Sequence, residues 1–139
     1  MTSRHGTRGH TADLGLWVEA DRLEELFSSA VAALSELMVR GPRQGELAWL
    51  PLALEGADLA ELLVQLLNEV VYRLDGESLL AVALDISRLE PGRLQARLGV
   101  LPFDPASHRL VEPVKAVTYH QAIVESWGRG FRAQVVVDV

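Results

Sequence analysis

The hydrophobic residues repeat with two periods, and these periods predict the elements. Apolar and other residues alternate at the start of segment 14–19, which is the pattern of a strand with one buried face. Segments 23–38 and 59–74 instead place apolar residues every three or four positions, as an amphipathic helix does. The pattern therefore predicts one strand and two helices in the first half of the chain.

Polar residues mark the ends of both predicted helices. Asp21 precedes Glu24 by three residues, and Asp58 precedes Glu61 by the same interval, which is the spacing of a capping box. Gly76 follows the second apolar face and is expected to be the left-handed residue that ends that helix. The first helix is expected to stop before Gly41-Pro42, so each helix has a predicted start and a predicted end.

The remaining apolar segments favour strands. They are residues 46–55, 79–87, 93–101, 114–125 and 129–139. Pro51 indicates that the first of them lies at a sheet edge, because proline cannot donate to a strand ladder. Residues 103–112 are expected to form a loop. Strands concentrated at the end of the chain predict an α+β fold, with two long helices on a mostly antiparallel sheet in the order strand, helix, strand, helix and then four strands.

Composition narrows the class of protein. A chain of 139 residues, 49% of them hydrophobic, has the size and composition of one soluble domain. Residues 1–9 are expected to be a loose leader. The absence of cysteine excludes disulfides and cysteine-ligated zinc, and a net charge of -6 disfavours a large nucleic-acid surface of its own. No apolar run of about 18 residues occurs, so we expect a cytoplasmic protein without a membrane span.

The final strand carries the first candidate for chemistry. Asp138 stands one position before Val139, so two carboxylates are expected within one residue of each other. Asp13, in His10-Thr11-Ala12-Asp13, supplies a third oxygen group if it lies opposite Asp138. Such a set suits a hard cation, calcium or magnesium. The alternatives are ordinary turn chemistry for Asp13 and a solvated strand end for Asp138.

The segment Val114–His120 carries the second candidate. Alternation places Lys115, Val117 and Tyr119 on one strand face, although a lysine there is equally consistent with simple exposure to solvent. His10 and His120 do not have the spacing of a common zinc motif. A Gly-x-Ser-x-Gly elbow and a phosphate-binding glycine loop are both absent from the sequence. A binding or helper role is therefore favoured over catalysis.

Four segments of the chain together carry a resemblance to a known family. They are His10–Leu16 together with Leu23–Phe27, then Leu62–Glu69, then Glu112–His120, and finally Val136–Val139. Their residues, order and spacing across residues 10–139 resemble those of the archease family.

The resemblance implies one domain over residues 10–139 that is not itself a catalyst. Archease activates the RNA ligase that joins a 2′,3′-cyclic or 3′-phosphate end to a 5′-hydroxyl end in tRNA splicing and RNA repair. That ligase uses GTP and manganese and forms a histidine–guanylate intermediate. The resemblance implies that this chain promotes ligase guanylylation and repeated turnover, and that it meets RNA only through the ligase.

The resemblance also implies the site residues. A divalent metal, expected to be calcium, would be held by Asp13, Asp138 and Val139. Lys115, His10 and His120 are further candidates for activating the partner. The chain departs from the family pattern at Gly6–Gly9, at Gln65 and at Gly99-Val100, and these positions could alter partner contacts.

Two other functions remain open from the residues alone. A metal-dependent phosphoester hydrolase could use His10, Asp13, His120 and Asp138. A metal-free adaptor or chaperone-like protein would need none of these side chains. Assays of phosphatase and nuclease activity and a calcium titration discriminate among the three hypotheses.

Overall fold

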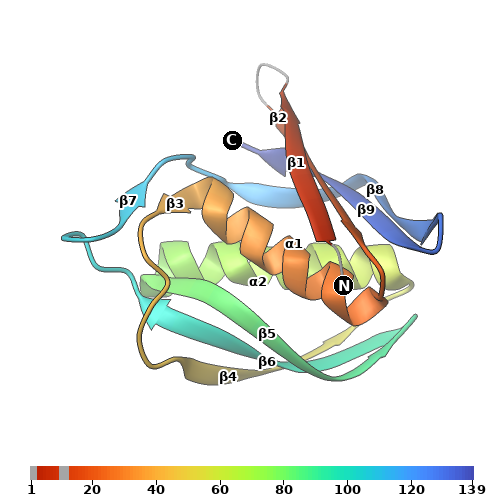
Figure 1. The fold of residues 1–139 in the computed structure, drawn as a ribbon, viewed down its shortest axis with the longest axis horizontal. Helices are drawn as coiled ribbons and strands as arrows, with labels where there is room; N and C mark the ends of the chain where they lie inside the picture. Colours follow the sequence, from red (N-terminus) through yellow and green to blue (C-terminus); the bar gives the residue numbers. More distant parts are fainter. Residues whose placement is uncertain (1–2, 10–12) are drawn as a thin grey trace.

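Two helices lie between two antiparallel sheets in the computed structural model, which describes residues 3–9 and 13–139 (Figure 1). The described part of the chain contains β1 (Ser3–Gly9), β2 (Asp13–Ala20), α1 (Leu23–Met38), β3 (Val39–Arg40), β4 (Ala48–Glu55), α2 (Leu59–Glu77), β5 (Leu79–Glu90), β6 (Arg93–Pro102), β7 (Arg109–Leu110), β8 (Ala116–Trp127) and β9 (Gly130–Asp138). The predicted α+β class is confirmed, with the helices enclosed on two sides.

The sheets are of unequal size. The larger has the strand order β1-β2-β9-β8, the smaller has the order β4-β6-β5, and β3 pairs with β7 separately. All the recorded strand pairs are antiparallel. Helix α1 contacts β2 and β5, and α2 contacts β8 and β5, so each helix contacts both the larger and the smaller sheet. None of the described helices is long and apolar enough to cross a membrane.

Strand alternation separates a core face from an outer face in the larger sheet. Leu16 and Val18 on β2 and Val135 and Val137 on β9 are buried against the helices, as the sequence pattern predicts. Side chains of neighbouring residues in a strand point to opposite faces. Asp138 follows the buried Val137 and therefore lies on the outer face. Neither helix of the described residues covers that face (Figure 1).

The prediction of a loose leader is wrong for the described residues 3–9, which form β1 and pair with β2. The pairing places Gly6 opposite Trp17, and a Cβ added at Gly6 would lie 2.6 Å from Trp17 Nε1. The indole therefore covers the glycine backbone, a contact that only glycine permits. A polar, glycine-containing segment has become a strand because of a tertiary contact.

The predicted helix ends are partly correct. Asp58 caps α2 by accepting a hydrogen bond from Glu61 N–H at 2.8 Å, as expected. The residue before α1 is Arg22, which provides no side-chain cap, so the capping box predicted from Asp21 to Glu24 is wrong. Glu25 Oε1 instead accepts from Asp21 N–H at 3.3 Å.

The end of α2 also differs from the prediction. Gly76 lies inside the helix, and the left-handed residue is Ser78, with a φ of 56°. An ion pair between Arg73 and Glu77 joins the turn that precedes the predicted end to the turn that follows it. This contact favours continuation of the helix past the glycine.

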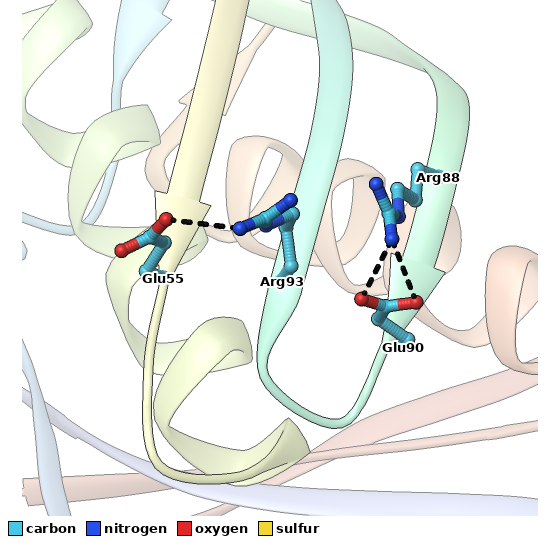
Figure 2. Close-up of polar contacts among 4 residues, drawn as sticks. All are labelled: Glu55, Arg88, Glu90 and Arg93. Carbon is cyan, nitrogen blue, oxygen red and sulfur yellow. Dashed lines mark hydrogen bonds and ion pairs between the residues drawn. The ribbon is translucent and has the colours of Figure 1, made fainter.

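The outer face of the smaller sheet is a solvated, charged surface. Near the β5–β6 turn Arg93 pairs with Glu55 at 3.4 Å, and Arg88 pairs with Glu90 at 3.1 Å (Figure 2). These pairs are exposed and contribute little to stability. Pro51 lies on the edge strand β4, as its lack of an N–H donor predicts.

Candidate functional site

Asp13 and Asp138 are directly opposite each other where β2 begins and β9 ends. Directly opposed residues of an antiparallel pair share a face, with Cβ atoms about 4.5–5.5 Å apart. Both residues are half-buried, and the next partner of Asp138 on its other side is Ala116 of β8. Segments from the two ends of the chain thus bring two carboxylates together, as the sequence hypothesis required.

Asp13, Asp138 and the next residue, Val139, can each offer oxygen atoms to a metal ion. Two like charges directly opposed destabilise a sheet, and a hard cation bound between them would remove that cost. The Val139 side chain packs against the hydrophobic core, which fixes the main chain next to Asp138. The donor set therefore fits a cation such as calcium, with two carboxylates and the main-chain oxygens of Val139 as candidates.

Histidine does not join this pair in the described residues. No three histidine, aspartate or glutamate side chains there are grouped as a metal site, so His120 does not complete a side-chain cluster with Asp13 and Asp138. His10 lies outside the described residues. The geometry thus offers two carboxylates plus main-chain oxygens, and it does not support the four-residue set of the hydrolase hypothesis.

Lys115 adjoins the carboxylate pair through its main chain. Its N–H donates to Asp138 O at 2.8 Å, while its side chain is exposed and belongs to none of the ion pairs among the described residues. The predicted common face of Lys115, Val117 and Tyr119 is wrong, because Val117 is buried while the other two are exposed. Strand alternation fails here because β8 begins after Lys115 and bulges at Tyr119.

Asn68 of α2 holds this part of β8, although it is not among the site residues predicted from the sequence. Val117 N–H donates to Asn68 Oδ1, and Asn68 Nδ2 donates to Val117 O, both at 2.9 Å. Since β8 is an edge strand, the amide occupies backbone groups that a further strand would otherwise use. The available signal was the position of this amide directly after Leu66 and Leu67 of the apolar helix face.

A bulge in β8 carries His120 away from regular pairing. Between Thr118 and Ile123 the strand advances five residues, while β9 advances two, from Val136 to Gln134. Gln121 within it has a φ of 62°, which is unusual for a residue other than glycine. His120 is exposed in this bulge and has no partner in the recorded register with β9, so regular strand alternation does not place it beside Asp138.

Tyr119 connects the bulge to α2. Its hydroxyl donates to Asp58 Oδ2 at 3.1 Å, and Asp58 is the residue that caps α2. The hydrogen bond to Asp58 raises the pKa of the Tyr119 hydroxyl above its ordinary value, with smaller contributions from desolvation and from the charges of Asp58 and Glu61. The bulge is thus tied to a fixed helix end.

Comparison with known proteins gives one consistent result. A model of the archease protein family matches residues 6–139. Protein archease of Pyrococcus furiosus is 33% identical over 134 residues, covering 94% of this chain and 94% of that protein. Protein archease of Methanopyrus kandleri is 33% identical over 133 residues, covering 94% of this chain and 95% of that protein.

Solved structures agree on the fold. The solution structure of protein 1598 from Methanobacterium thermoautotrophicum superposes with a TM-score of 0.70 at 26% identity, covering 97% of this chain and 98% of that one. A crystal structure from Thermotoga maritima, described as an archease and possible chaperone, has a TM-score of 0.62 at 18% identity and covers 98% of this chain and all of that one. The similarity to the second protein is one of fold.

Proposed function

Since the chain belongs to the archease family, we propose that it is a non-catalytic, metal-binding activator of the RNA ligase that joins 2′,3′-cyclic or 3′-phosphate ends to 5′-hydroxyl ends. In this proposal it promotes guanylylation of the ligase and repeated turnover in tRNA splicing and RNA repair in the cytoplasm. RNA is contacted through the ligase.

The direct opposition of Asp13 and Asp138 carries this proposal. The pair lies on the outer face of the larger sheet, at the end where β2 begins and β9 ends, and both residues are partly exposed. Asp13, Asp138 and the main-chain oxygens of Val139 would hold the metal. Oxygen donors suit a hard cation, and we propose calcium, the metal that the resemblance to the family implies. When bound, the cation would supply positive charge that neutralises the two carboxylates.

The neighbouring residues have separate roles in the proposal. Lys115 offers an exposed ammonium group that can bind an anionic group of the partner. Asn68 holds Val117 of β8 in place, and this fixes the strand that borders Asp138. His120, which is exposed, stays in the proposal as a partner contact. His10 stays in the proposal too, and it lies outside the described residues.

Catalysis by the chain itself has less support. The hydrolase alternative needs His120 beside the carboxylates, whereas the described residues contain no such side-chain cluster. A metal-free adaptor remains the second candidate, and calcium titration separates it from our proposal: binding that requires Asp13 and Asp138 favours the activator.

Ligation with substrate in excess tests the proposed function. The partner ligase is supplied with GTP, manganese and an RNA that carries a 2′,3′-cyclic phosphate and a 5′-hydroxyl end. We expect product to exceed the amount of ligase only when this protein is present, and we expect no phosphoester hydrolysis by the protein alone. Equal product with and without the protein would refute the proposal, and turnover by the isolated chain would favour the hydrolase.

A further inference from the structure

An apolar cleft lies at the ends of α1 and α2 and is lined by the segment that connects β7 to β8. That segment is hydrogen-bonded to the end of β9, since Lys115 N–H donates to Asp138 O. Its volume is about 440 Å³, within the range of specific binding pockets. Met38 of α1 and Leu74 of α2 are buried at its base, while Leu110 and Val111 form part of its wall. We name this feature the β7–β8 cleft.

The wall of the cleft exposes large apolar side chains. Leu110 is 60% exposed and Val111 is 42% exposed, and they are adjacent in sequence. Adjacent exposed aliphatic side chains beside an apolar hollow are typical of a surface that another molecule covers. Other large exposed apolar residues, such as Trp49 and Ile123, do not line this cleft.

Main-chain hydrogen bonds hold the wall in position. Val111 N–H donates to Met38 O at 2.8 Å, which satisfies a carbonyl at the end of α1. Val114 N–H donates to Glu112 O at 2.9 Å, and Lys115 N–H donates to Asp138 O at 2.8 Å. The cleft is thus formed before binding, which lowers the entropic cost of association.

The rim identifies the chemistry of the occupant. Asp75 and Glu112 line the cleft with Lys115, whose N–H donates to the main-chain oxygen of Asp138. An apolar hollow bordered mainly by acidic groups is complementary to an aliphatic or aromatic anchor that has a basic neighbour. The same rim carries Lys115, to which the proposed function gives the role of binding an anionic group of the partner.

We propose that the β7–β8 cleft is the docking site for a segment of the RNA ligase, which inserts an apolar anchor against Leu110 and Val111 and places a basic side chain near Asp75 and Glu112. This inference rests on the proposed function for the identity of the partner. Docking here would hold the ligase against the Asp13–Asp138 end of the sheet, because Lys115 lines the cleft and its N–H is hydrogen-bonded to Asp138 O.

Binding of the ligase to single variants tests this inference by calorimetry or biolayer interferometry. Val111→Asp and Leu110→Ser replace exposed side chains, so both variants are expected to keep the circular dichroism spectrum and the calcium affinity of wild type. We expect each to weaken ligase binding at least about tenfold, which is about 1.4 kcal/mol. Ile123→Asp is the matched control, since Ile123 is also 42% exposed and lies outside the cleft.

The outcomes separate the two proposals. Wild-type affinity in Val111→Asp, or an equal loss in Ile123→Asp, overturns the docking site while leaving stimulation by wild type intact. A wild-type protein that neither binds nor stimulates the ligase overturns the proposed function and the cleft's occupant together. Sedimentation that shows a dimer abolished by Val111→Asp would identify a second copy of the chain as the occupant and also overturn the inference.

Discussion

Asp13 of β2 and Asp138 of β9 face each other across one antiparallel pair. Directly opposed like charges cost up to about 1 kcal/mol in a sheet. We therefore expect Asp13→Asn to leave the free energy of unfolding unchanged or slightly higher in chelator-treated protein. With calcium at 100 times Kd, the free energy of unfolding of wild type should rise by about 2.7 kcal/mol. The Asp13→Asn variant should lose most of this rise.

Scanning calorimetry with chelator and with calcium measures both effects. Asp85→Asn is the control, because Asp85 is an exposed residue of β5 in the smaller sheet. The metal assignment would be wrong if Asp13→Asn and wild type showed the same calcium-dependent rise in Tm.

Asn68 supports the strand that borders the site. In Asn68→Ala both hydrogen-bonding groups of Val117 lose their partner, and an unpaired, partly buried backbone group costs about 1–3 kcal/mol. Gln65→Ala is the matched control on the same helix, and its loss of a surface hydrogen bond to Glu55 O should cost less. Urea unfolding compares the two, and equal costs would remove the special role of Asn68.

Arg43 closes the C-terminal end of α1. Its Nη2 donates to Ser35 O at 2.9 Å and to Val39 O at 2.8 Å. Burial lowers the pKa of Arg43, partly offset by the charge of Glu36, while Arg40 lowers it further. We expect Arg43→Met to cost about 1.5–3 kcal/mol per charged hydrogen bond lost, measured by urea unfolding. The exposed Arg40, changed to Met, should cost far less; similar costs would contradict this assignment.

Tyr119 should make stability depend on alkaline pH. Its pKa is raised in the folded protein by donation to Asp58, so the neutral hydroxyl is favoured by folding. The contribution is then fully present below the ordinary tyrosine pKa of about 10 and is lost as the pH rises through the folded value. Urea midpoints of wild type and Tyr119→Phe should differ at neutral pH and converge at higher pH. A constant difference would exclude this hydrogen bond as the cause.

One-sided burial explains which elements could be predicted from the sequence. Strands β2 and β9 and both helices bury one face, so their apolar periods are visible. Strand β1 was missed because its residues are polar or small and its pairing depends on Trp17 covering Gly6. The bulge after Thr118 has no composition signal, since the sequence continues as a strand through it.

The candidate site was predictable only in part for a similar reason. Asp13 and Asp138 could be named from their positions and from the resemblance, but their opposition depends on a register between segments that are far apart in the chain. Lys115 was named without its main-chain bond to Asp138. Asn68 could have been noticed as an amide within an apolar helix face, but its partner on β8 is a tertiary feature.

Guanylylation of the ligase tests the central claim most directly. The covalent guanylate formed on the ligase is measured with GTP and manganese in the presence of wild type, Asp138→Asn or the control Asp85→Asn. We predict strong stimulation by wild type and by the control and little by Asp138→Asn, with all three proteins equally folded by circular dichroism. Equal stimulation by wild type and Asp138→Asn would contradict the account.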